Sequence, residues 1–383
     1  MHLLCLLLIP LAFLLAVPLT LLARAVGHRL NALDGAGVAG QVKAAARPVP
    51  NTGGMAIVLA FSLPIVLGLV AVITPLVDSL TSLVPALTDH LPGIRSETVN
   101  AVVLLTFLGA LHVVGLVDDR RPLGPLFKLA VMLGCALGVV LLTGSRMLTM
   151  LDSHVGGPWL SVLLTVLWIV VVTNAFNFLD NMDGLSAGVA MIAAGCFLAA
   201  ALIHGQWFVG ACLALLVGTL GGFLVFNFPW RAGGGGGASI FMGDGGSLVV
   251  GFLLAFLTVR TTYYAPGTGG AGGAGTSWYA VFMPVIVLAI PLYDLVSVCA
   301  IRLRQGRSPF VGDMQHFSHR LVARGLSRRD AVLIIYGATG VTAIGGIALG
   351  SLADWQAMLV GVQMLLVLLV IALYEGRTAR AAV

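Results

Sequence analysis

The sequence predicts an all-α integral membrane protein, a bundle of about eleven transmembrane helices. Of its 383 residues, 59% are apolar and only 9% are charged, and the mean hydropathy is +1.05. A soluble domain carries about 25% charged residues, so this composition excludes the soluble globular class. The apolar residues fall into runs of roughly 20, the length that a helix needs to cross a bilayer with its backbone hydrogen bonds satisfied internally.

Eleven apolar runs are the candidate spans. The first is long and is followed by Arg24 and Arg29 rather than by a small-residue cleavage site, so we expect an uncleaved span and not a signal peptide. The runs cover residues 3–23, 55–74, 99–117, 126–142, 159–178, 185–203, 207–225, 245–262, 278–300, 331–352 and 355–374.

The basic residues predict the orientation of the bundle. All but three of the 20 Lys and Arg residues fall in one set of alternate loops or in the C-terminal tail; the exceptions are Arg95, Arg146 and Arg260. The positive-inside rule places this set in the cytoplasm, so we expect the N-terminus outside and the C-terminus in the cytoplasm of a cell inner (plasma) membrane. The net charge of +5 suits anionic lipid headgroups or a phosphorylated substrate and does not require a nucleic acid.

We expect one domain, residues 1–383, without a soluble part. Its cytoplasmic loops are predicted at about 24–54, 118–125, 174–184, 227–246 and 301–330. Glycine-rich stretches at 233–237 and 267–275 lack the features of a phosphate-binding loop and are interpreted as flexible linkers. The five cysteines fall inside predicted spans and are interpreted as packing residues.

The first polar motif is Asp118-Asp119, at the end of the third predicted span. Two negative charges at the C-terminal end of a helix interact unfavourably with its dipole, so a positive group is expected nearby. The neighbouring Arg120 and Arg121 could supply that charge in a purely structural role. A metal ion or a cationic grip on a substrate is the functional alternative, and the sequence leaves both open.

A second motif places Asn174, Asn177, Asp180 and Asp183 at intervals of three residues where the fifth predicted span ends. On a straight α-helix this spacing drifts by about 60° per step, so only a tightened or unwound helix end turns all four toward one cavity. Amide and carboxylate oxygens are the donors that Mg²⁺ prefers. The structural alternative is that Asp183 caps the next span, which accounts for one residue of the four.

A third motif, Phe241 to Asp244, precedes the eighth predicted span. Asp244 could serve as a helix N-cap, and the glycines around it would also let a ligand approach the backbone. Phe241 is apolar within a polar loop, which is typical of an interfacial anchor or of a stacking surface for a base.

The last long loop gathers His316, His319 and Arg320, a combination that suits phosphate binding. Asp294 lies inside the ninth predicted span, and an acid within a membrane is a functional candidate by default. Asp294 and Arg302 stand eight residues apart on the same helix face, through Val298, so a partial charge pairing between them is the structural alternative.

These motifs resemble the polyprenyl-phosphate N-acetylhexosamine-1-phosphate transferase family (glycosyltransferase family 4), and within it the bacterial undecaprenyl-phosphate GlcNAc-1-phosphate transferases. The resemblance extends along nearly the whole chain. The matching motifs are Lys43 with Pro50-Asn-Thr-Gly53-Gly54, Gly115 to Asp119 with Lys128, Asn177 to Gly184, Phe241 to Asp244, Asp294, and Ser308 through Leu321.

The resemblance implies a Mg²⁺-dependent enzyme, with Mn²⁺ as a substitute, that transfers HexNAc-1-phosphate from a UDP-sugar to undecaprenyl phosphate and releases UMP. This would be the first lipid-linked step of a cell-envelope polysaccharide such as lipopolysaccharide or teichoic acid. It also implies catalytic roles for Asp118 and Asp119, and metal binding by Asn177 and Asp244. The substrate-binding residues implied are Lys43, Lys128, Asn174, Asp180, Asp183, Phe241, Asp294, Arg302, His316, His319 and Arg320.

Asp118 is often viewed as a base in this family, but a phosphate monoester is already largely dianionic at pH 7. An orienting role for Asp118 is therefore an equal alternative. Ser318 and Ala45 stand where the family commonly has histidines, which affects the expected phosphate contacts and not the reaction class.

Two other functions are weighed. The related phospho-MurNAc-pentapeptide transferase usually carries three consecutive histidines and a Thr-Pro-Thr-Met-Gly-Gly motif, which this sequence lacks. A lipid or sugar transporter is expected to keep its acids near the membrane midplane, and here they lie at one face. Which HexNAc is used, which polymer is built and whether the chain forms a homodimer stay open.

Overall fold

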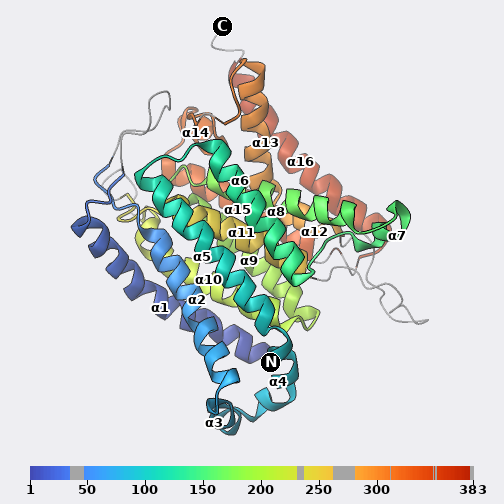
Figure 1. Ribbon diagram of the computed structural model, residues 1–383. Coiled ribbons are helices and arrows are strands. Elements are labelled where there is room, and N and C mark those ends of the chain that lie inside the picture. Colours follow the sequence, from blue (N-terminus) through green and yellow to red (C-terminus); the bar gives the residue numbers. More distant parts are fainter. Residues whose placement is uncertain are drawn as a thin grey trace.

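The computed structural model describes residues 1–34, 47–230, 237–261, 281–310, 312–347, 349 and 352–379. Within these residues the chain is helical, and the one β-type contact is an isolated bridge between Leu33 and Pro50. The all-α membrane fold class is therefore confirmed (Figure 1). Lys43, Ala45, most of the 233–237 stretch and all of the 267–275 stretch lie outside the described residues.

The helices that coincide with the predicted spans are all long except α12, which has five residues. They are α1 (His2–Arg29), α2 (Gly53–Ile73), α5 (Thr98–Arg120), α6 (Pro125–Thr143), α8 (Trp159–Leu179), α9 (Leu185–Ile203), α10 (Trp207–Asn227), α11 (Asp244–Arg260), α12 (Met283–Val287), α13 (Ala289–Arg304), α15 (Arg328–Ile347) and α16 (Asp354–Ala379). Short helices fill the connections: α3 (Leu76–Leu83), η1 (Pro85–His90), α4 (Leu91–Ser96), η2 (Thr149–Leu151), α7 (Asp152–Val155) and α14 (Phe317–Val322).

Nine helices of the described chain are long and apolar enough to cross a membrane: α1, α2, α5, α6, α8, α9, α10, α15 and α16. The other two predicted spans coincide with shorter helices. One is α11, with 17 residues, and the other is divided at Leu288 into α12 and α13. Pro291 explains the division, because it has no amide hydrogen to donate to the carbonyl of Val287.

The core of the bundle lies around α11, which is buried along nearly its whole length and packs against α8, α5 and α2 (Figure 1). Small residues allow close packing: a Cβ added at Gly251 would lie 2.8 Å from the Cα of Thr173 on α8. Helix α16 is peripheral, with only 6% of its apolar window buried, so its surface is suited to lipid.

At one end of the bundle α5, α8 and α13 end, and α6, α9 and α11 begin (Figure 1). Polar side chains from distant segments meet there. Arg24 at the end of α1 donates to Ser239 before α11 over 3.4 Å. A separate ion pair, Arg260–Glu97 at 2.6 Å, joins the opposite ends of α11 and α5. The loops predicted to share one membrane face therefore lie together.

Candidate active site

A cavity of about 990 Å³ opens at this end of the bundle. Most of the residues singled out in the sequence line it, although they come from six separate segments. They are Asp119, Lys128, Asn174, Asn177, Asp180, Asp183, Phe241, Asp244, Arg302, His316 and His319. Asp118, Asp294 and Arg320 lie outside its lining, and Lys43 is not among the described residues.

Lys128 forms the centre of what we call the lysine cluster, which comprises Lys128, Asp118, Asp244 and Asn177. The Lys128 ammonium contacts Asp118 Oδ2 at 2.8 Å and Asp244 Oδ2 at 2.7 Å. Asn177 Nδ2 donates to the other oxygen of Asp244 at 3.0 Å. Among the described residues, the cation that contacts Asp118 is therefore Lys128 on the next helix, and the structural alternative in which Arg120 or Arg121 supplies that charge was wrong.

Asp119 faces the start of α11. Its carboxylate accepts hydrogen bonds from the backbone amides of Asp244, at 3.0 Å, and Gly245, at 3.3 Å. Asn51, just before α2, donates its side-chain amide to the same carboxylate at 2.8 Å. The two neighbouring aspartates thus have different partners.

The Asn174–Asp183 motif lies where α8 unwinds. The helix ends at Leu179, Asp180 forms its C-cap, and Gly184 (φ +77°) precedes α9. All four polar side chains line the cavity, which is the geometry expected of an unwound helix end. Desolvation, followed by the charges of Asp244, Asp119 and Asp183, holds the pKa of Asp180 well above its usual range.

The two helix-capping alternatives were wrong. Gly184 occupies the N-cap of α9, and Asp183 accepts two hydrogen bonds from the Arg47 guanidinium, one of them at 2.9 Å. Asp244 is the first residue of α11, and Gly243 (φ +69°) is its N-cap. Both carboxylates are therefore directed to partners outside their own helices.

Phe241 presents its ring to a cation. The guanidinium carbon of Arg47 lies 4.7 Å from the ring centroid, and both residues line the cavity. The Phe241 ring therefore makes a cation–π contact within the cavity. Arg47 was not among the predicted candidates, because no pattern in the sequence separates it from the other cytoplasmic arginines.

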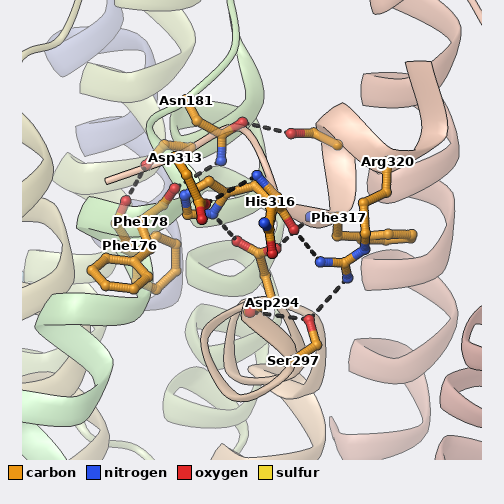
Figure 2. Close-up of polar contacts among 12 residues, drawn as sticks. Phe176, Phe178, Asn181, Asp294, Ser297, Asp313, His316, Phe317 and Arg320 are labelled. Carbon is orange, nitrogen blue, oxygen red and sulfur yellow. Dashed lines mark hydrogen bonds and ion pairs between the residues drawn. The ribbon is translucent and has the colours of Figure 1, made fainter. Parts of the chain in front are cut away.

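The second polar group at the cavity is the histidine loop, residues 312–320 together with Asp294 on α13 (Figure 2). Asp294 is fully buried. It accepts hydrogen bonds from His316 Nδ1, at 2.9 Å, and from the backbone amide of Phe317, at 2.6 Å. Asp294 therefore lies behind the cavity wall and holds His316, which faces the cavity.

Arg302 does not pair with Asp294, so that expectation was wrong. Instead it donates to Asp313 at 3.0 Å and to the carbonyl of Pro309 at 2.7 Å, and it is 1% exposed. Burial by itself would raise the pKa of Asp313, but the hydrogen bonds from Arg302 and from the backbone amide of Gln315, together with the nearby positive charge, outweigh burial and hold that pKa below its usual value. The loop is thereby tied to α13 at two places.

The end of the loop is bound to other helices. Ser318, where the family commonly has a histidine, donates to Asn181 at 2.5 Å and so joins the loop to the end of α8. Arg320 faces away from the cavity, with contacts to Glu375 at 2.7 Å and Ser297 at 2.9 Å. Burial, followed by the charges of His316 and Arg328, lowers the pKa of His319 to about 4, so its imidazole is neutral at pH 7.

Several cavity-lining polar residues were not among the candidates: Asn51, Asn181, Asp313 and Arg328, besides Arg47. Two signals existed. Asn51 lies inside the motif that begins at Pro50, and Asp313 and Arg328 lie in the long polar loop that was itself noted.

One part of the cavity wall is apolar and belongs to α6, α8 and α13. Its residues include Val171, which is 38% exposed, Val296, 64%, and Leu303, 63%. Exposed apolar side chains on helices of this kind face lipid. The cavity therefore joins a polar floor to a surface that an alkyl chain can contact.

The similarity to known proteins includes the residues that form the cavity. The model of the family "Glycosyl transferase family 4" matches residues 101–262, which include Asp118, Lys128, Asn177 and Asp244. The chain is 30% identical over 289 residues to the "Probable undecaprenyl-phosphate N-acetylglucosaminyl 1-phosphate transferase" of Bacillus subtilis, covering 74% of this chain and 75% of that protein.

Two further relatives have similar names. The "Decaprenyl-phosphate N-acetylglucosaminephosphotransferase" of Mycobacterium tuberculosis is 37% identical over 251 residues, 61% of this chain and 59% of the relative. The "Undecaprenyl-phosphate alpha-N-acetylglucosaminyl 1-phosphate transferase" of Escherichia coli K12 is 28% identical over 269 residues, 67% of this chain and 66% of the relative.

Proposed function

The chain belongs to glycosyl transferase family 4, and from this membership we propose that it transfers GlcNAc-1-phosphate from UDP-GlcNAc to undecaprenyl phosphate and releases UMP. The product would be the first lipid-linked intermediate of a cell-envelope polysaccharide. The observation that supports this proposal best is the single cavity that combines carboxylates, amides, cations and a lipid-facing wall. These are the groups that two phosphorylated substrates, one soluble and one lipid, require.

Each part of the cavity suits one part of the substrates. The apolar wall at Val171, Val296 and Leu303 would receive the polyprenyl chain. The Phe241 ring would stack on the uracil, in the place where it now contacts Arg47. Lys128, Arg302 and His316 would bind phosphate oxygens between these two ends.

The reaction would begin with attack by an oxygen of the lipid phosphate on the sugar-bearing β-phosphorus of UDP-GlcNAc. The bond from that phosphorus to the bridging oxygen breaks, and UMP leaves with the electron pair. Phosphoryl transfer needs positioning and charge neutralisation more than covalent help. Because the attacking phosphate carries about −1.5 to −2 charge at pH 7, Asp118 would act mainly by orienting Lys128, which it contacts at 2.8 Å.

The residues of the lysine cluster also suit Mg²⁺. The carboxylates of Asp118 and Asp244 share the single ammonium of Lys128, so one cation faces two acids and a second cation would complete the neutralisation of the pair. No group of three or more His, Cys, Asp or Glu side chains in the described ranges is arranged as a complete metal site.

Asp244 and Asn177 would hold the ion, and the carboxyl group of Asp180 would offer a further oxygen ligand. A Mg²⁺ ion bound there would supply neutralisation of the pyrophosphate charge. Asn177 donates through its nitrogen to Asp244, which leaves its carbonyl oxygen for such a role.

We also propose that the bundle spans the inner (plasma) membrane eleven times and that the cavity opens to the cytoplasm, where UDP-sugars are made. In this topology α11 and the divided α12–α13 cross as well, although they are shorter than the other nine helices. The support is the alternation of helix ends at the cavity and the basic residues of those loops.

The test is UMP release by the purified protein in detergent with UDP-GlcNAc, undecaprenyl phosphate and Mg²⁺. We expect UMP and a lipid-linked GlcNAc-diphosphate in equal amounts, and none when the lipid is omitted. UDP-GalNAc and UDP-MurNAc-pentapeptide serve as alternative donors. Release with the pentapeptide donor alone would contradict the GlcNAc assignment, and no release with any donor would contradict the proposed reaction.

A further inference from the structure

Asp119 contacts the backbone of another helix rather than the Lys128 ammonium that Asp118 binds. Its Oδ1 accepts the amide of Asp244 at 3.0 Å, and its Oδ2 accepts the amide of Gly245 at 3.3 Å. The Asn51 side chain completes the set at 2.8 Å. Three donors therefore converge on this carboxylate, and two of them are main-chain groups.

Those main-chain groups belong to the first turn of α11. The first amides of a helix have no partner within it, and a side chain at the N-cap usually accepts one of them. The N-cap here is Gly243, which has no side chain to offer. Asp119 therefore does for α11 what an N-cap aspartate does, but it does so from α5.

Two further residues of α5 contact the first turn of α11. His112, Gly115 and Asp119 are spaced i, i+3 and i+7, so they lie on one stripe of the helix. His112 Nδ1 is 2.7 Å from the carbonyl oxygen of Gly245, and a Cβ added at Gly115 would lie 2.4 Å from the Gly245 nitrogen. The two helices thus meet backbone to backbone, and Asp119 forms the last contact before Asp244.

We propose that Asp119 is a positioning residue that caps α11 from α5 and thereby fixes Asp244 against Lys128 and Asn177. Its task requires hydrogen-bond acceptors and does not require proton transfer or metal binding. The catalytic consequence rests on the proposed function, whereas the capping itself does not.

The test compares Asp119→Asn with Asp119→Ala. Asparagine keeps one oxygen that can accept from the Asp244 amide and from Asn51, and it loses the longer contact to the Gly245 amide, so D119N should keep kcat within about fivefold of the original protein, with an unchanged pH profile. D119A leaves the α11 amides without an acceptor and should lower kcat by about 30-fold. The matched pair Asp118→Asn and Asp118→Ala should show no such rescue, because there the charge on Lys128 is what matters.

Hydrogen–deuterium exchange of the peptide that contains Asp244 gives a readout independent of activity. We expect about tenfold faster exchange in D119A, and little change in D119N or D118N. Unchanged exchange in D119A would overturn the capping role. Equal loss of activity in D119N and D119A would overturn the positioning role and favour a base or a metal ligand. If the original protein releases no UMP, the proposed function fails and the exchange arm still decides the capping.

Discussion

The lysine cluster and the histidine loop border the same cavity but differ in charge balance. In the histidine loop each acid has a dedicated partner: Asp294 has His316, and Asp313 has Arg302. The loop's Arg320 likewise pairs with Glu375 of α16. Around Lys128, the two carboxylates of Asp118 and Asp244 share one ammonium. Buried charges that are paired one to one hold structure together, whereas an excess of one sign leaves a site in need of a counter-ion.

This difference indicates that the two groups have different roles at the same cavity. The histidine loop is a cavity wall held in place by buried contacts behind it, chiefly through Asp294, which is itself inaccessible. The lysine cluster is the part whose electrostatics change when a cation or a phosphate binds. Variants of the two groups should therefore fail in different ways.

The largest effect is expected at Lys128. Lys128→Met leaves Asp118 and Asp244 adjacent without their shared cation, so UMP release should fall by about 10²–10³-fold. Lys128→Arg keeps the charge with altered geometry and should retain more activity. A Lys128→Met variant with activity within threefold of the original protein would show that the cluster is structural, like the loop.

A smaller effect is expected at Asp294. Asp294→Ala removes the acceptor for His316 and for the Phe317 amide, so activity should fall about 10–100-fold through misplacement of His316. The melting temperature should fall too, because buried donors are left unsatisfied. Arg320→Gln is the matched control in the same loop: it should lower the melting temperature and change kcat less than threefold, and a loss equal to that of Asp294→Ala would contradict this division.

The smallest effect concerns pH. The pKa of His319 is about 4 in the folded protein, below the usual histidine value of about 6.5, so the unfolded chain binds the proton more readily. Stability is therefore complete above about pH 6.5 and declines as the pH falls toward 4. We expect a drop of about 2–4 °C in the melting temperature, measured by scanning fluorimetry in detergent. His319→Gln should remove this dependence of the melting temperature on pH. An unchanged dependence would show that other titratable groups cause it.

The comparison also shows what the sequence could predict. Residue type and spacing were sufficient to single out the acids and the amide of the lysine cluster, and Asp294 of the histidine loop, because these groups are unusual beside apolar spans; Asp313 was missed. Their partners were not predictable from spacing alone: Lys128 and Asp244 lie 116 residues apart, and Arg47 and Asp183 lie 136 apart. Local reasoning instead suggested neighbours such as Arg120 for Asp118 and Arg302 for Asp294, and packing between helices decided otherwise.

The helical class was predictable for a similar reason, since every span has its own apolar run. The division of the ninth span was missed, although Pro291 signals it. The capping of α11 by Asp119 of α5 could not be predicted from the sequence, because it depends on the backbone contact between Gly115 and Gly245.

The central claim is that the lysine cluster, and not the histidine loop, receives the divalent cation. Titration of Mn²⁺ by electron paramagnetic resonance, with UDP-GlcNAc present and the lipid absent, tests it most directly. We predict one bound ion per chain in the original protein and in Asp294→Asn, and its loss in Asp244→Asn. Equal binding in all three proteins, or loss in Asp294→Asn with retention in Asp244→Asn, would contradict the claim.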